Sequence, residues 1–166
     1  MYKFVLDADG AIKLAKAGVL ERLAENSNCI IPQEVYAEVL RGKEKMRQDA
    51  FITETLVNEG KLGVVENAKT EKKKPGEDFA LAAFKTQKAD AVITDDTKFI
   101  SSLKRENIKF IIPSDIVVWL AKKGELSKQE GLTALEKMRA SIREDAYTES
   151  VSLIRGEQND DDSLPA

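Results

Sequence analysis

The chain has 166 residues and a formal net charge of -3, and 42% of its residues are hydrophobic and 33% charged. This length and balance are typical of one globular domain, and the apolar runs are far shorter than the roughly 20 residues that a membrane span needs. Because the chain has no histidine and a single cysteine, Cys29, it excludes Ser-His-Asp and Cys-His catalytic systems and zinc sites with histidine or thiolate ligands.

Five short apolar segments predict the strands of a sheet. They lie at residues 2–6, 28–31, 61–66, 90–94 and 108–112. Between them, apolar residues at helical spacing predict helices over residues 10–26, 32–42, 43–60, 77–89 and 96–107. This alternation predicts an α/β fold in which helices cover both faces of a parallel sheet.

Cys29 falls within the second of these strands and is expected to be a small buried core residue. One cysteine cannot form an internal disulfide, and the N-terminus shows no basic segment followed by an apolar leader. We therefore expect a cytoplasmic location and no association with a membrane.

The pattern changes after residue 112. Residues 113–156 carry no strand signal and predict two or three helices, with breaks near Gly124 and Arg143 and with Ser114 and Ser127 as N-caps. Residues 157–166 are polar and acidic, which predicts a disordered tail. The predicted organisation is a domain over residues 1–112, a C-terminal helical extension over 113–156 and the tail over 157–166.

Acidic residues gather near the ends of the predicted strands. They are Asp7 after the first strand, Asp95 and Asp96 after the fourth, Glu34 and Glu38 on the helix after the second, and Glu77 and Asp78 at the start of the helix before the fourth. Taken singly, most of these acids have a structural explanation as helix caps or solvated groups. Asp7 differs, because a carboxylate that ends a buried apolar run needs a metal ion or a lysine as its partner. Carboxylate oxygens suit Mg²⁺ or Mn²⁺.

Four segments of the chain resemble a known family. They are FVLDADGAI (4–12), IIPQEVYAEVL (30–40), EDFALAAFKTQKADAVITDD (77–96) and IKFIIPSDIV (108–117). In this order and spacing, residues 1 to about 112 resemble a PIN-domain nuclease, of the kind that includes the VapC-type toxins. The resemblance implies a PIN-like three-layer α/β/α fold with a central parallel sheet of about five strands. The helices after residue 113 lie outside the part of the chain that the resemblance covers.

The resemblance also implies an active site. Its four acids map to Asp7, Glu38, Asp78 and Asp96, with Asp95 as the alternative for the fourth. These acids would hold one or two Mg²⁺ or Mn²⁺ ions, whose activated water would cleave single-stranded RNA internally and leave a 5′-phosphate and a 3′-hydroxyl. Asp9 departs from the family, in which a small hydroxyl or amide residue is more usual at this position.

Further residues receive auxiliary roles. Asp9 lies beside the first acid, and Thr94 either hydrogen-bonds the metal's water or a phosphate oxygen or is a strand residue alone. The polar loop before the third acid offers four candidate contacts to RNA, which are otherwise solvated: Lys69, Lys72, Lys73 and Lys74. The expected partners are single-stranded RNA, an antitoxin protein if the chain is a toxin, and a second copy in a homodimer. The apolar face at residues 116–120, which includes Trp119, is expected to form core or a dimer interface.

Two other functions stay open on the sequence. Asp-x-Asp-Gly at residues 7–10 also resembles the nucleophile loop of a haloacid-dehalogenase-like phosphatase, with Asp7 as the nucleophile. However, Ala11 follows where that superfamily normally has Thr or Val, and this interpretation gives residues 32–38 no purpose. The other alternative is a non-catalytic PIN-like RNA-binding module, although a pure RNA binder has no reason to gather four acids. The sequence does not distinguish a toxin from an RNA-processing nuclease.

Overall fold

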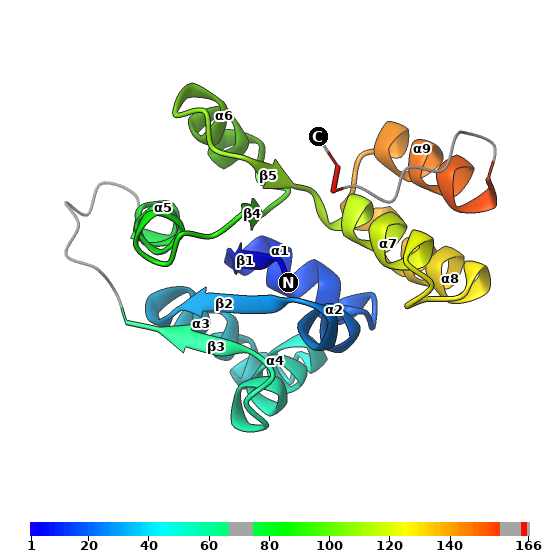
Figure 1. The fold of residues 1–166 in the computed structure, drawn as a ribbon. Helices are drawn as coiled ribbons and strands as arrows, with labels where there is room; N and C mark the ends of the chain where they lie inside the picture. Colours follow the sequence, from blue (N-terminus) through cyan, green and yellow to red (C-terminus); the bar gives the residue numbers. More distant parts are fainter. Residues whose placement is uncertain (67–74, 157–163, 166) are drawn as a thin grey trace.

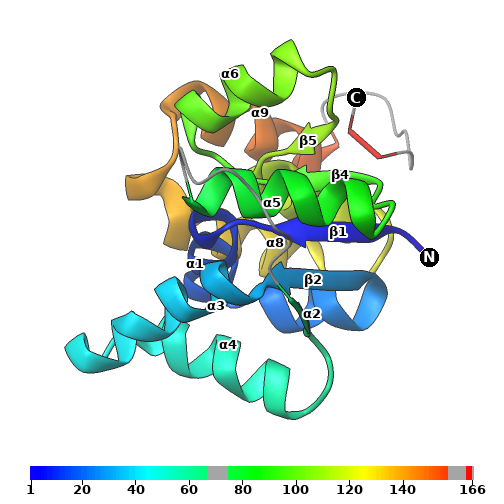
Figure 2. The same ribbon diagram turned by 90° about the vertical axis from the view of Figure 1, so that its left-hand side faces the viewer.

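The computed structural model describes residues 1–66, 75–156 and 164–165, which form an α/β fold (Figure 1, Figure 2). The five-stranded sheet has the order β3-β2-β1-β4-β5, and every pairing in it is parallel. Its strands are β1 (Lys3–Leu6), β2 (Asn28–Pro32), β3 (Gly63–Val65), β4 (Ala91–Ile93) and β5 (Phe110–Ile111). The predicted fold class and sheet are therefore confirmed.

Helices connect the strands and continue after the last one. They are α1 (Ala8–Lys16), α2 (Leu20–Asn26), α3 (Gln33–Leu40), α4 (Gln48–Asn58), α5 (Pro75–Thr86), α6 (Thr97–Arg105), α7 (Pro113–Lys122), α8 (Lys128–Met138) and α9 (Glu144–Arg155). Two short 3₁₀ helices, η1 (Arg41–Lys45) and η2 (Arg139–Ser141), extend α3 and α8.

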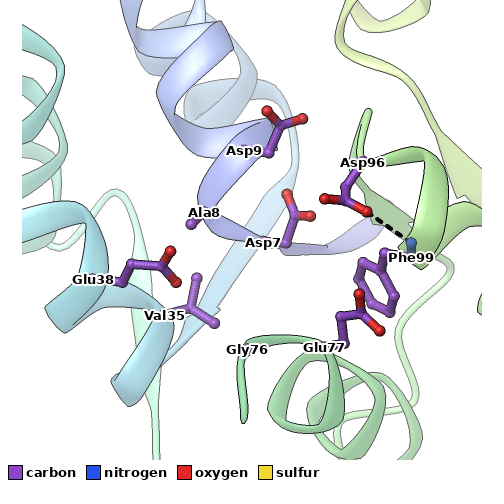
Figure 3. Close-up of a pocket in the computed structure, with 9 residues that line it drawn as sticks. All are labelled: Asp7, Ala8, Asp9, Val35, Glu38, Gly76, Glu77, Asp96 and Phe99. Atoms are coloured by element: carbon purple, nitrogen blue, oxygen red, sulfur yellow. Dashed lines mark hydrogen bonds between the residues drawn. The ribbon is translucent and has the colours of Figure 1, made fainter. Parts of the chain in front are cut away.

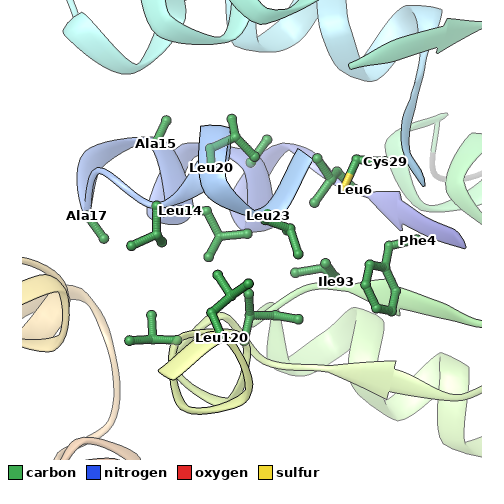
Figure 4. Close-up of a cluster of buried hydrophobic side chains, with 14 of the residues drawn as sticks. Phe4, Leu6, Leu14, Ala15, Ala17, Leu20, Leu23, Cys29, Ile93 and Leu120 are labelled. Carbon is green, nitrogen blue, oxygen red and sulfur yellow. The ribbon is translucent and has the colours of Figure 1, made fainter. Parts of the chain in front are cut away.

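Alternate side chains of each central strand enter two separate apolar cores, because successive residues of a strand point to opposite faces. Val5 of β1 lies in the smaller core with Phe99 and Leu103 of α6 and with apolar residues of α5. Phe4 and Leu6 lie in the larger core, which α1 to α4 and α7 to α9 complete (Figure 4). Helices thus cover both faces of the sheet and form the outer layers.

Two predicted helices are interrupted. The helix predicted over residues 10–26 is divided into α1 and α2, because Gly18 adopts a left-handed conformation with φ 76° that glycine tolerates at little cost. The helix predicted over residues 43–60 starts with η1, and Met46 at φ 53° separates it from α4. The first of these breaks lets Val19 and Leu20 turn into the larger core.

The predicted breaks in the C-terminal helices are confirmed, since α7 ends at Lys122 and α9 begins at Glu144. Ser127 caps α8 as predicted, and its hydroxyl accepts a hydrogen bond from the Glu130 amide at 3.0 Å. Ser114 is not a cap. The helix α7 already begins at Pro113, because proline favours the first helical position.

The apolar face at residues 116–120 lies inside the protein. These five residues of α7 are at most 6% exposed and belong to the larger core. The suggestion that this face forms a dimer interface is therefore wrong, and the alternative of a core position is right. Trp119 packs edge-on against Phe4, with 5.8 Å between the ring centroids. The homodimer itself stays a prediction.

Parts of the predicted acidic tail, residues 157–163 and 166, lie outside the described residues. Leu164 packs against the larger core. Across the segments that the structure describes, no helix has both the length and the apolar character needed to cross a membrane. Cys29 on β2 is 1% exposed, as predicted for a core residue, and burial raises the pKa of its thiol to about 12.

Candidate active site

A pocket of about 330 Å³ opens at the carboxyl ends of β1 and β4. Its lining is rich in acidic residues and consists of Asp7, Ala8, Asp9, Val35, Glu38, Gly76, Glu77, Asp96 and Phe99. Figure 3 shows the other four carboxylates arranged around Asp7. The acids come from α1, α3, α5 and the start of α6, so the sheet edge gathers residues that are distant in the sequence.

Asp7 lies at the centre of this pocket and is only 8% exposed. It is the N-cap of α1, and its Oδ1 accepts a hydrogen bond from the Gly10 amide at 2.6 Å. The hydroxyl of Thr94 donates to its Oδ2. Burial raises the pKa of Asp7 to about 7, and the neighbouring carboxylates of Asp9 and Asp96 add to this rise, while the bonds from Thr94 and Gly10 oppose it.

The turn between β4 and α6 presents Asp96 to the pocket. Thr94, which is fully buried, accepts a hydrogen bond from the Asp96 amide at 3.2 Å while it donates to Asp7. Asp96 in turn caps α6, because its Oδ1 accepts from the Phe99 amide at 2.8 Å (Figure 3). One hydroxyl therefore links the first and the fourth predicted acids.

Asp95 faces a different partner. Its Oδ2 accepts a hydrogen bond from Lys13 Nζ at 2.9 Å, and its amide donates to Asp9 Oδ2 at 3.1 Å. Among the described residues, Asp96 lines the pocket and Asp95 does not. The geometry thus favours Asp96 as the fourth acid and gives Asp95 a supporting place beside it.

The helices α3 and α5 close the pocket from the other side. Glu38 lies near the C-terminal end of α3, and Glu77 lies in the first turn of α5. A Cβ atom placed on Gly76 would lie 3.7 Å from Glu38 Oε2, so the start of α5 passes close to this carboxylate. Among the described residues, Glu77 lines the pocket, whereas its neighbour Asp78 does not. Asp78, which the sequence resemblance gives as the third acid, stays a prediction, and Glu77 is a second candidate for the same role.

The donor set suits a hard divalent cation, because the five charged groups that line the pocket among the described residues are all carboxylates. A cation would also offset the cost of burying Asp7. In the described part of the chain, however, no three acidic, histidine or cysteine residues are already grouped closely enough to hold a metal ion. The long side chains of Glu38 and Glu77 must therefore turn inward before they can join Asp7 and Asp96 around one ion.

Four predicted RNA contacts lie outside the described residues: Lys69, Lys72, Lys73 and Lys74. In the sequence these lysines lie between β3 and α5, and α5 contributes Glu77 to the pocket.

A comparison with curated proteins finds no match for the chain. The sequence model of a family described as PIN domain matches residues 3–155. This match includes α7, α8 and α9, which the sequence resemblance had left outside, and it covers the whole acidic pocket. The chain belongs to the PIN domain family.

Proposed function

We propose that the chain is a metal-dependent endoribonuclease that hydrolyses phosphodiester bonds in single-stranded RNA. The observation that carries this proposal is the pocket in which four further carboxylates surround the buried Asp7 at the carboxyl ends of β1 and β4. Membership of the PIN domain family, whose members are generally nucleases that bind Mg²⁺, supports the same conclusion. The proposed cofactor is Mg²⁺ or Mn²⁺, as one or two ions.

Asp7, Asp96 and Glu38 are proposed ligands, and the third acid is either the predicted Asp78 or its neighbour Glu77. Asp7 and Asp96 are held rigidly by their bonds to helix amides, so their remaining lone pairs have fixed directions. Thr94 donates to Asp7 and so favours the ionised form that a cation needs. When bound, a divalent cation supplies a Lewis acid that polarises the phosphoryl group and lowers the pKa of a bound water.

The charge of the pocket limits how RNA can approach it. The five acids of the pocket repel a phosphate backbone, so RNA can approach the pocket only after the negative charge is offset. We assign contact with the phosphates outside the pocket to Lys69, Lys72, Lys73 and Lys74. Binding through these lysines should weaken steeply as the salt concentration rises.

The biological role that we propose is that of a toxin with a protein antitoxin or of an RNA-processing nuclease. Growth of cells that express the chain separates the two, because a toxin arrests growth unless its antitoxin is present. Light scattering at micromolar concentration tests the proposed homodimer.

The alternatives receive less support. A haloacid-dehalogenase-like phosphatase would use Asp7 as its nucleophile, but this leaves Glu38 without a task, although it lines the same pocket. A non-catalytic RNA-binding module gives no reason for five carboxylates to line one pocket.

The test compares cleavage of a labelled single-stranded RNA in Mn²⁺, in Mg²⁺ and in EDTA. Glu38→Gln removes a charge from the pocket, and Glu34→Gln is its matched control one turn earlier on α3, because Glu34 does not line the pocket. We expect the parent protein to cleave the RNA only with Mn²⁺ or Mg²⁺. Glu38→Gln should lose this cleavage, and Glu34→Gln should retain it. Absence of cleavage together with absence of any metal-induced rise in melting temperature would overturn it.

A further inference from the structure

A lysine lies behind the acidic pocket and contacts two of its neighbouring carboxylates. Lys13 Nζ lies 2.9 Å from Asp95 Oδ2 and 3.3 Å from Asp9 Oδ1. The side chain of Lys13 is 14% exposed and that of Asp95 12%, so the pair is largely shielded from water. Asp9 is 35% exposed because it also lines the pocket.

These contacts belong to a set of bonds that joins two separate parts of the site. The start of α1 carries Asp7, Asp9 and Lys13, and the turn after β4 carries Thr94 to Asp96. The Thr94 hydroxyl donates to Asp7, the Asp95 amide donates to Asp9, and Lys13 donates to Asp95. Of these bonds, the one from Lys13 is the only one in which a cation bridges the two segments.

The charges show why a cation is needed here. Position 9 carries an acid in addition to Asp7, Glu38, Glu77 and Asp96, so five carboxylates line the pocket among the described residues. Lys13 lies one helical turn after Asp9 on α1 and offsets this additional charge. Burial lowers the pKa of Lys13, but its contacts with Asp95 and Asp9 together outweigh burial and raise the pKa, so the ammonium form is favoured.

We propose that Lys13 is a positioning residue: its ammonium group holds Asp9 and Asp95 together, keeps Asp9 from acting as an extra metal ligand, and so fixes Asp96 opposite Asp7. The proposal rests on the proposed function, because it concerns how the same pocket holds its cation. Lys13 acts through the two carboxylates and does not touch the RNA.

The test uses Lys13→Met, which keeps an unbranched side chain shorter by one heavy atom and removes its charge. Lys16→Met is the matched control, because Lys16 lies on the same helix and is exposed. A Mn²⁺ titration followed by melting temperature measures binding without any cleavage. Single-turnover cleavage gives the rate and the KM for RNA separately, and the NMR shift of the Asp95 amide reports its bond to Asp9.

Lys13→Met is expected to bind Mn²⁺ about three-fold more tightly, because Asp9 becomes available to the ion, yet to cleave about ten-fold more slowly with an unchanged KM. The Asp95 amide shift should move, whereas Lys16→Met should change none of these values. Adding Asp9→Asn to Lys13→Met removes the excess charge and should return Mn²⁺ binding and most of the rate. Lys13→Arg should stay within about three-fold of the parent rate.

Unchanged Mn²⁺ binding and rate in Lys13→Met would overturn the proposal. The proposal would also fail if Lys13→Met lost Mn²⁺ binding and rate in proportion to a fall in melting temperature, and if adding Asp9→Asn did not restore them. Such losses would indicate a purely structural ion pair. If Lys13→Met does not fold, Lys13→Gln takes its place with the same expected Mn²⁺ change. If the parent protein cleaves no RNA, the proposed function fails, whereas the Mn²⁺ titration and the Asp95 shift still decide the role of Lys13.

Discussion

The hydroxyl of Thr94 donates a hydrogen bond to the carboxylate of Asp7, although 87 positions separate the two residues in the sequence. This bond joins the carboxyl ends of the adjacent parallel strands β4 and β1, beside the pocket that Asp7 lines. Because Thr94 also accepts from the Asp96 amide, its hydroxyl is oriented and cannot turn away from Asp7 without losing a second bond.

Replacing Thr94 with Val should therefore alter the pH dependence of cleavage. The bond from Thr94 lowers the pKa of Asp7, so its loss should raise that pKa further above its usual range and move the acid limb of the pH profile to higher pH. Cleavage at pH 7 should fall about three- to ten-fold and recover partly at pH 8.5. Thr94→Ser keeps the hydroxyl and should keep the parent profile; a shifted profile in Thr94→Ser would argue against this explanation.

Asp7→Asn should stabilise the metal-free protein at neutral and alkaline pH. Burial raises the pKa of Asp7 from 3.8 to about 7, so the folded state holds its proton more tightly than the unfolded chain. The contribution of Asp7 to stability is therefore complete below pH 3.8 and is lost as the pH rises through about 7. The charged group then costs up to about 4 kcal/mol, because one pKa unit corresponds to about 1.4 kcal/mol.

Urea unfolding in EDTA at pH 5 and pH 8 measures this effect. Asn also caps helices well, so α1 should persist in the variant. The advantage of Asp7→Asn should be larger at pH 8 than at pH 5. An equal difference at both pH values would mean that Asp7 does not titrate in this range. Added Mn²⁺ should raise the melting temperature of the parent but not that of Asp7→Asn.

Glu77→Gln and Asp78→Asn should differ in cleavage. Glu77 lines the pocket and its neighbour does not, so Glu77→Gln should lower the rate by about 100-fold or more. Asp78→Asn should retain most of the activity. Metal-dependent cleavage of one labelled RNA by both variants makes the comparison, with circular dichroism to show that each is folded. The opposite order would identify Asp78, as predicted from the sequence, as the third acid.

Gly10→Ala should destabilise the protein and disturb the pocket. A Cβ atom on Gly10 would overlap the carbonyl oxygen of Ile93 in β4, so α1 must move away from the sheet. Such overpacking costs about 1–3 kcal/mol, and the displacement also lengthens the bond from the Gly10 amide to Asp7.

Gly63→Ala is the control for this change. There a Cβ atom would lie 3.4 Å from Ile30 Cγ2, which is ordinary contact, so its free energy of unfolding should be close to that of the parent. Urea unfolding of both variants checks the contrast. Equal stabilities of the two variants would show that α1 has room to shift. The close approach of α1 to Ile93 also explains why residue 10, the last of Asp-Ala-Asp-Gly, is a glycine. The phosphatase interpretation of this motif is not needed to account for it.

The positions of Asp7 and Asp96 in the pocket could be predicted from the sequence because strand ends are easy to recognise. Asp7 and Asp96 follow buried apolar runs, and adjacent parallel strands bring such ends together. The choice between Glu77 and Asp78 was harder. Neighbouring positions on a helix point about 100° apart, so only the placement of α5 decides which carboxylate faces the pocket.

Lys13 was missed for a related reason. In the sequence it is one of two lysines on an amphipathic helix, and nothing local distinguishes it from the exposed Lys16. Its partner Asp95 lies 82 positions away, and the pairing exists only because β4 lies beside β1. The face at residues 116–120 was ambiguous because an apolar stripe looks the same whether a protein's own sheet or a second copy covers it.

The buried thiol of Cys29 can report local unfolding of the sheet. Its thiol is 1% exposed in a strand beside β1, and its raised pKa leaves almost no thiolate at neutral pH. A thiol reagent can therefore modify the native chain only during fluctuations that separate β2 from its covering helices. The rate of thiol modification, measured at increasing metal concentrations, therefore shows how strongly a cation bound at one edge of the sheet suppresses local unfolding around β2.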